Sequence, residues 1–392
     1  MLEILSQKHI QKFIRENLDS DTQRLLLNSP KFPDLPMREV VQQIESLRKI
    51  RLKISSWAEK NIICPPVLSV EQASSEQTAI FKTSFFSGNE FVDLTGGMGV
   101  DAYFFAQKFE KITYIEQNKA LFETTKYNFE QLNLKNASFF CEKAEVFLQN
   151  LDHKVDLIYI DPARRDQNQQ KTVQLSDCEP NILEILDLLL QKADQVLIKT
   201  SPLLDIALAQ TQLRSLEKII VISLENECKE VLYLLGQHTE NQTVECYNLK
   251  KNQIQSFVFD LKKERELQID FHFPEKYLYE ANSSVLKAGA FKSIAKQFDL
   301  KKLHANSHLY TSRSLKLDFV GRIFEILHIC KYDRKEILKF LPDSKANITV
   351  RNFPDSVAQI RQKTKIKDGG EHYLFATTDL QDRKMVLICK KL

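Results

Sequence analysis

The chain has 392 residues, of which 43% are hydrophobic and 27% charged, a composition typical of a globular protein with two or three domains. No segment approaches roughly 18 uninterrupted apolar residues, the N-terminus lacks the long apolar centre of a signal peptide, and the seven cysteines show no CxxC spacing. We therefore expect a cytoplasmic protein without a membrane span or a metal site.

Residues 1–75 are predicted to form an N-terminal helical region. Apolar residues recur at helical spacing in SQKHIQKFIREN (6–17) and in MREVVQQIESLRKIRLKISSWAEKN (37–61). Prolines 30, 33 and 36 interrupt the pattern between these stretches. Ser74 or Ser75 is suited to cap the helix that follows.

Residues 76–262 are predicted to form an α/β domain with a Rossmann-like, mostly parallel sheet. Short apolar runs alternate with helical stretches, and these runs are EFVDL (90–94), ITYIE (112–116), VDLIYID (155–161), QVLIKT (195–200) and KIIVISL (218–224). Strand–helix alternation is typical of βαβ units, whose ligands bind at the carboxyl ends of the strands. Residues 226–262 are strand-like without long helices and suit an antiparallel edge. Functional residues are therefore expected directly after the apolar runs.

Residues 263–315 and 316–392 are predicted to form two smaller modules, the second an α+β unit ending in a hairpin. One helix is expected over 283–298 (SSVLKAGAFKSIAKQF). Residues 262–392 hold 26 Lys and Arg against 16 Asp and Glu, a formal +10, whereas residues 1–261 hold 29 against 36, a formal −7. This asymmetry indicates a polyanionic partner such as RNA, with a solvated basic surface as the alternative.

Three of the chain's nine glycines lie together in FVDLTGGMGVDAYFFAQ (91–107), between a strand pattern and a helical one. Glycine lets the backbone approach a ligand where a Cβ would collide. Asp93 precedes the loop, and Glu116 ends the next apolar run, where a carboxylate can accept both ribose hydroxyls. Two ligands fit this pattern, a dinucleotide through GMGVDA and S-adenosylmethionine (SAM) through Asp93. A tight turn that serves packing alone is the third reading.

The run VDLIYIDPARR places Asp161-Pro162-Ala163-Arg164-Arg165 at a strand end expected beside the glycine loop. A proline turn is the simple interpretation. For a methyltransferase, Asp161 could accept a hydrogen bond from a target N–H, and the backbone at Pro162 could supply a second acceptor. Such contacts aim a nitrogen lone pair and so act by positioning. This motif favours SAM over a dinucleotide.

Together, DLTGGMGVD, YIE and DPARR resemble the class I SAM-dependent methyltransferases. The strings PPVLSVEQASSEQTAIFK, ENECKEVLYLL, YLYEANSSVLKAGAFKSIAKQFDLKKLHANSHLYTS and KANITVRNFPDSVAQIRQKTKIKDGGEHYLFATT resemble the bacterial THUMP-like-domain methyltransferases. That family places a ferredoxin-like segment and a THUMP-like domain after the catalytic domain. The resemblance therefore implies a Rossmann-like methyltransferase with an RNA-linked appendage.

Carried over position by position, the resemblance implies a SAM motif around the glycines, a ribose-binding acid at Glu116, an adenine-facing loop near Ala144 and a catalytic loop at DPARR. The candidate residues are Asp161, Pro162, Ala163 and Arg164 for catalysis, and Asp93, Thr95, Gly96, Gly97, Gly99, Asp101, Glu116, Gln117, Ala144 and Asp161 for cofactor binding.

The motif departs from the usual amino-methyltransferase pattern of Asp or Asn, two prolines and an aromatic ring. Ala163 and Arg164 stand in the last two places, and arginine can stack on a base or pair with phosphate. We also weigh Lys199, which ends the fifth apolar run, as a substrate-facing residue or a solvated strand-end lysine. SSEQTA (74–79) either passes under the methionine end of SAM or only caps a helix.

The sequence thus predicts methyl transfer from SAM to a nitrogen of an RNA base, in tRNA or rRNA. A methyltransferase of small molecules or protein is the second hypothesis. A non-catalytic RNA-binding protein that retains the fold is the third.

Overall fold

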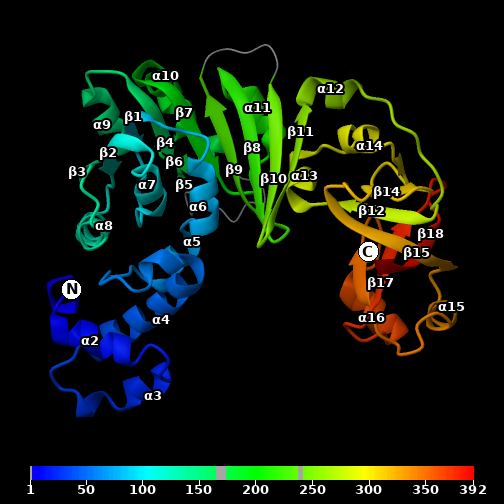
Figure 1. The fold of residues 1–392 in the computed structure, drawn as a ribbon, viewed down its shortest axis with the longest axis horizontal. Coiled ribbons are helices and arrows are strands. Elements are labelled where there is room, and N and C mark those ends of the chain that lie inside the picture. Colours follow the sequence, from blue (N-terminus) through cyan, green and yellow to red (C-terminus); the bar gives the residue numbers. More distant parts are fainter. Residues whose placement is uncertain (1, 165–173, 237–241) are drawn as a thin grey trace. The chain divides into compact units, whose positions relative to one another are not determined.

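Two structural units account for the chain. The computed structural model describes residues 2–164, 174–236 and 242–392 (Figure 1). The first unit consists of Met1–Glu217 with Val231–Thr239, and the second of Lys218–Glu230 with Glu240–Leu392. Within the described residues, no helix is long and apolar enough to cross a membrane.

Helices occupy the start of the first unit, as their apolar spacing predicts (blue in Figure 1). They are α1 (Leu2–Leu5), α2 (Lys8–Glu16), α3 (Thr22–Leu27), η1 (Ser29–Lys31), α4 (Met37–Lys53), η2 (Ser55–Trp57), α5 (Val67–Gln72) and α6 (Glu76–Thr83). The predicted cap is confirmed, because the Ser75 hydroxyl accepts the Thr78 N–H at 3.2 Å. The Asn128 side chain bonds both the N–H and the carbonyl of Ile63, each at 2.8 Å. These bonds fasten the segment after η2 to the α/β part of the same unit.

The sheet of the first unit has the strand order β9-β7-β4-β1-β2-β3. Neighbouring strands are parallel except β9, which runs antiparallel to β7. The elements are β1 (Gly88–Asp93), α7 (Val100–Phe105), β2 (Phe109–Ile115), α8 (Lys119–Gln131), β3 (Ala137–Phe140), α9 (Ala144–Asn150), β4 (Val155–Ile160), β5 (Ala163–Arg164), η3 (Leu175–Asp177), β6 (Cys178–Glu179), α10 (Ile182–Lys192), β7 (Ala193–Thr200), α11 (Ile206–Gln212) and β9 (Glu227–Leu235). The Rossmann-like parallel sheet predicted from strand–helix alternation is confirmed.

The second unit contains β8 (Leu216–Leu224), paired parallel with β10 (Thr243–Lys250), which pairs antiparallel with β11 (Gln253–Asp260). A seven-stranded sheet follows in the order β13-β14-β12-β15-β18-β17-β16. Its strands are β12 (Tyr277–Ala281), β13 (Lys301–Lys302), β14 (Leu309–Ser312), β15 (Gly321–Lys331), β16 (Asn347–Val350), β17 (His372–Thr378) and β18 (Lys384–Lys391), and the helices of this unit are α12 (Leu261–Glu266), α13 (Ser283–Ala288), α14 (Ser293–Gln297), α15 (Arg334–Leu338) and α16 (Val357–Thr364). The predicted terminal hairpin is confirmed as β17 and β18.

The single helix expected over 283–298 is wrong, because two helices occupy this stretch. α13 ends at Gly289, which has φ +78° and caps the helix in the left-handed conformation. Glycine adopts this conformation without the penalty that a Cβ imposes, so it commonly ends helices. The apolar spacing continues across the break, which is why the sequence pattern reads as one helix.

Candidate cofactor-binding site

The glycine loop joins β1 to α7 with backbone conformations that favour glycine. Gly97 has φ +55° and Gly99 has φ +80°. At Gly96 a Cβ would lie 2.0 Å from a ring carbon of Tyr114. The Tyr114 hydroxyl donates a hydrogen bond to the Gly97 carbonyl at 2.5 Å, and the Thr125 hydroxyl donates to the same carbonyl at 3.0 Å. Side chains from β2 and α8 therefore fix the loop, and three of its five residues present bare backbone.

Glu116, at the tip of β2, is held against this loop. One carboxylate oxygen accepts the Gly97 N–H at 3.0 Å, and the other accepts the Asn118 N–H at 2.7 Å. Gln117 lies beside it and also lines the cavity. The sequence-predicted acid is thus fixed against the glycine loop and lines the cavity.

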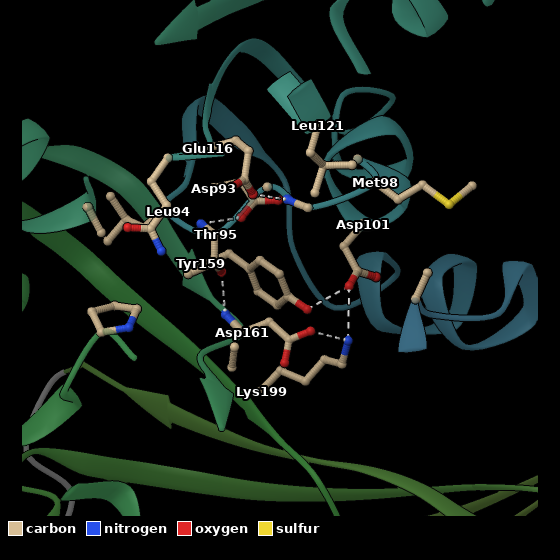
Figure 2. Close-up of a pocket in the computed structure, with 18 of the residues that line it drawn as sticks. Asp93, Leu94, Thr95, Met98, Asp101, Glu116, Leu121, Tyr159, Asp161 and Lys199 are labelled. Carbon is tan, nitrogen blue, oxygen red and sulfur yellow. Dashed lines mark hydrogen bonds and ion pairs between the residues drawn. The ribbon is translucent and has the colours of Figure 1, made fainter. Parts of the chain in front are cut away.

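Asp161 lies beside the glycine loop, as the strand pattern predicts. β1 pairs with β4 in parallel, with Asp93 opposite Tyr159. The Asp161 N–H donates to the Thr95 hydroxyl at 2.7 Å, which ties the two loops together (Figure 2). This contact brings the two most informative sequence motifs to one edge of the sheet.

The rest of the DPARR motif continues into β5. Ala163 lines the cavity and is exposed, whereas Pro162 is half-buried and is not part of the lining. Arg164 is described only as a member of β5, which pairs with β6. Arg165 lies outside the described residues. Glu179 of β6 and the adjacent Pro180 contribute to the lining from the other side of this hairpin.

These loops enclose a cavity of about 400 Å³, within the range of roughly 300–1,000 Å³ that small-molecule sites occupy. The sequence-predicted residues that line it are Asp93, Thr95, Gly96, Gly97, Gly99, Asp101, Glu116, Gln117, Ala144, Asp161 and Ala163. Pro162 is not among the described lining residues.

The described lining is strongly acidic. It contains seven carboxyl side chains, Asp93, Asp101, Glu116, Glu142, Glu145, Asp161 and Glu179, against two lysines, Lys143 and Lys199. Burial raises the pKa of Asp93 well above its ordinary value, and the neighbouring carboxylates of Asp101 and Asp161 raise it further. A cationic ligand would therefore be attracted to this cavity, because its charge would reduce the repulsion between these carboxylates.

This electrostatic character separates the two ligands that the glycine pattern left open. SAM carries a sulfonium and an ammonium against one carboxylate, whereas a dinucleotide brings a doubly negative pyrophosphate to the loop. The acidic lining favours the first and opposes the second. The residues present therefore fit SAM.

A buried ion pair lies beside this cavity. The Lys82 ammonium is fully buried and lies 2.9 Å from Oδ1 of Asp101. Oδ2 of Asp101 accepts a hydrogen bond from the Tyr159 hydroxyl at 2.7 Å (Figure 2). The same oxygen accepts a hydrogen bond from the Ser74 hydroxyl at 2.8 Å. Burial raises the pKa of Asp101, but the charges of Lys82 and Lys199 and the Tyr159 bond outweigh it, so the pKa lies below its ordinary value.

Lys199, at the end of β7, joins this pair to Asp161. Its ammonium lies 2.6 Å from Oδ2 of Asp161, 2.9 Å from the Ser74 hydroxyl and 3.4 Å from Oδ2 of Asp101. Figure 2 shows Lys199 between the two acids. Of the two interpretations of Lys199 given above, the solvated strand-end lysine is therefore wrong, because its side chain is only 10% exposed and lies in the site.

Sequence reasoning missed Lys82 and Tyr159. Lys82 falls within the apolar helical stretch TAIFKT, where a lysine ordinarily points to solvent. A lysine on an apolar face is the signal that could have marked it, because lysines are almost never fully buried without a partner. Within the described part of the chain, no group of three or more His, Cys, Asp and Glu is placed to hold a metal ion.

Three family models match parts of the chain. They are Conserved hypothetical protein 95 over residues 76–198, a ferredoxin-like domain over residues 277–319 and a THUMP domain-like family over residues 321–391. No curated protein matches the chain.

Among solved structures, a protein from Porphyromonas gingivalis W83 that is assigned as a methyltransferase is 31% identical, with a TM-score of 0.87. The match covers 100% of this chain and 98% of that one. An rRNA methylase from Streptococcus thermophilus is 14% identical over 42% of this chain and 95% of its own, with a TM-score of 0.31. A methyltransferase from Streptococcus mutans in complex with SAH is 13% identical over 41% of this chain and 94% of its own, with a TM-score of 0.30.

Replacing Lys82 with methionine should destabilise the protein strongly, because it leaves the buried Asp101 carboxylate without its fully buried counter-ion. We expect the free energy of unfolding to fall by about 3–5 kcal/mol in urea titrations followed by circular dichroism. The matched control is Lys111→Met, which removes an exposed partner of Glu90 and should cost less than about 1 kcal/mol. Equal effects of the two substitutions would contradict a buried ion pair.

Proposed function

The chain belongs to the class I SAM-dependent methyltransferases that carry C-terminal ferredoxin-like and THUMP-like domains, and from this premise we propose that it methylates a nitrogen of an RNA base. SAM is the cofactor. The observation that carries the proposal is Asp161, an acceptor group tied to the glycine loop and facing the cavity.

The chemistry asked of the site is positioning. When bound, SAM supplies a methyl group on a positively charged sulfur, so the acceptor nitrogen needs correct placement more than a strong base. Asp161 accepts a hydrogen bond from the target N–H, and the backbone carbonyl at Pro162 offers a second acceptor. Two such contacts aim the nitrogen lone pair at the methyl carbon. Ala163 and Arg164 stand where related motifs carry a proline and an aromatic ring, and we assign Arg164 to contact the base or a phosphate.

Around the cofactor, we assign Glu116 and Gln117 to the ribose, Ala144 to the adenine and Asp93 to the ammonium group. Gly96 and Gly99 let the loop pack against Tyr114, Thr125 and Phe129, where a Cβ would collide. We assign the backbone of this loop, Thr95 to Gly99, to the nucleoside. Asp101 acts from beneath the methionine side through Ser74 and Lys199.

RNA as the substrate is supported by the charge of the C-terminal part. Residues 262–392 carry 26 Lys and Arg against 16 Asp and Glu. A formal +10 on this part of the chain suits the phosphate backbone, which supplies sequence-independent affinity. We propose that residues 76–262 form the catalytic domain and that residues 263–315 and 316–392 hold the RNA.

The direct test of RNA methylation compares a strain lacking the gene with its parent. Total tRNA and rRNA from both strains are digested to nucleosides and measured by mass spectrometry. We expect one N-methylated nucleoside to disappear in the deletion strain and to return on complementation. Identical nucleoside profiles would contradict RNA as the substrate, and calorimetry that finds no SAM binding would contradict the enzyme itself.

Asp161→Ala should abolish methyl transfer while leaving SAM binding nearly intact, because the side chain is assigned to the target nitrogen. We expect the rate to fall by at least about 10²-fold, with the Kd for SAH changing by less than about threefold. Calorimetry and transfer of labelled methyl to RNA from the deletion strain measure the two quantities. Asp194→Ala, an exposed carboxylate on β7 paired with Lys154, is the control and should change neither. Loss of SAH binding would instead make Asp161 a cofactor or folding residue.

RNA binding by the full chain should weaken with salt, because neutralised phosphates release counterions. With three or more phosphate contacts, affinity should fall at least about tenfold between about 50 and 200 mM salt. Fluorescence anisotropy with a labelled tRNA measures this slope. A flat slope would rule out the electrostatic role of the basic C-terminal part.

A further inference from the structure

Four charged side chains alternate in sign along the floor of the site. Lys82 meets Asp101, Asp101 meets Lys199, and Lys199 meets Asp161, with separations of 2.9, 3.4 and 2.6 Å. Exposure rises along the series, from 0% for the Lys82 side chain to 35% for that of Asp161. The buried end is therefore anchored in the core, and the other end is the acceptor group proposed above.

The contact between Lys199 and Asp161 is built by the sheet. Lys199 lies on β7 and Asp161 directly follows β4, and these strands pair in parallel with Ile160 opposite Ile198. The Ser74 hydroxyl and Asp101 hold the same ammonium from the opposite side. Lys199 is thus fixed by three acceptors that come from three different segments.

Asp161 must accept a hydrogen bond as a carboxylate, yet it lies among other carboxyl groups. Asp93 on β1 interacts electrostatically with Asp161, Asp101 on α7 shares the Lys199 ammonium with it, and Glu179 on β6 lines the same cavity. Lys82 on α6 pairs with Asp101. Neighbouring carboxylates repel one another, and a cation close to them relieves that repulsion. A protonated Asp161 would present an O–H to the target in place of a lone pair.

We propose that Lys199 is a positioning residue for methyl transfer, whose ammonium keeps Asp161 ionised and holds its carboxylate in one orientation for the target N–H. This inference rests on the role proposed above for Asp161. In the transfer step the target nitrogen's lone pair forms the new N–C bond, the electrons of the methyl–sulfur bond stay on sulfur, and the methylated nitrogen then loses to solvent the N–H proton that was hydrogen-bonded to Asp161. Lys199 neither gains nor loses a proton.

The first test needs no RNA. Melting temperatures are measured from about pH 4 to 8 for the wild type, Lys199→Met, Asp161→Asn and the double variant. Lys199→Met leaves the Asp161 carboxylate without the ammonium that lies 2.6 Å away and still close to Asp101, and this loss matters only at a pH where the carboxyl groups are ionised. We expect Lys199→Met to melt lower than the double variant near pH 8, and the difference to vanish near pH 4.

The proposal would be overturned if the melting-temperature changes of Lys199→Met and Asp161→Asn added up to that of the double variant at every pH. Such additivity would show that Lys199 does not set the ionisation of Asp161. Lys199→Arg, which keeps the charge, should melt closer to the wild type than Lys199→Met does. It also provides a folded variant if the methionine substitution proves too destabilising.

The second test separates positioning from a purely structural role. The pH dependence of kcat is measured with SAM and RNA from the deletion strain. In Lys199→Met we expect the acidic limb to move up by about 1–3 pH units, with SAH affinity by calorimetry changed less than about threefold. Lys154→Met, an exposed lysine paired with Asp194, is the control and should leave the limb in place.

Two outcomes of the second test would overturn the proposal. One is a folded Lys199→Met with an unshifted acidic limb, and the other is a loss of SAH binding without a shift, which would make Lys199 a cofactor residue. If the wild type methylates none of this RNA, the proposed function fails instead, and the melting experiment still decides whether Lys199 controls the charge of Asp161.

Discussion

The parallel pairing of β1 with β4 is the constraint on which the site depends. It sets Asp93 opposite Tyr159, so the glycine loop and the DPARR motif leave the sheet side by side. The hydrogen bond from the Asp161 N–H to Thr95 then closes the gap between them. The distance from the cofactor loop to the acceptor group is therefore set by strand register and not by loop conformation. Because side chains alternate across a strand, a slip of one residue would turn Tyr159 away from Asp101.

The site residues that could be predicted from the sequence are those that come directly after a strand. Gly96 to Gly99, Glu116 and Asp161 each come directly after an apolar run, and parallel strands bring their carboxyl ends to one edge. Thus these residues could be grouped before any coordinates were known. The charge environment of these residues could not be predicted, because Glu142, Glu145 and Glu179 come to line the same cavity only in the folded chain.

Features that depend on long-range partners escaped the sequence pattern. Lys82 resembles a surface lysine on a helix, and its partners Asp101 and Tyr159 lie far along the chain in other elements. The spacing of apolar residues cannot show that the Lys82 ammonium points inward, because the Asp101 carboxylate reaches it only when α6 and α7 pack together in the folded chain. The helix end at Gly289 was missed for a local reason. Apolar residues continue at helical spacing on both sides of it, and only the left-handed backbone conformation of Gly289 shows that α13 ends there.

The segment before the α/β part has a consequence for how the enzyme can be divided. Ser69, Gln72, Ala73 and Ser74 form one wall of the cavity, and the Asn128 bonds to Ile63 fasten the chain leading to them. A fragment beginning at residue 76 would keep the glycine loop and DPARR but would lose this wall and open the cavity to water. Solvent would then weaken the ion pairs of Lys82 and Lys199 by raising the local dielectric constant. The segment that ends at Ser74 therefore keeps water away from the ion pairs of the site.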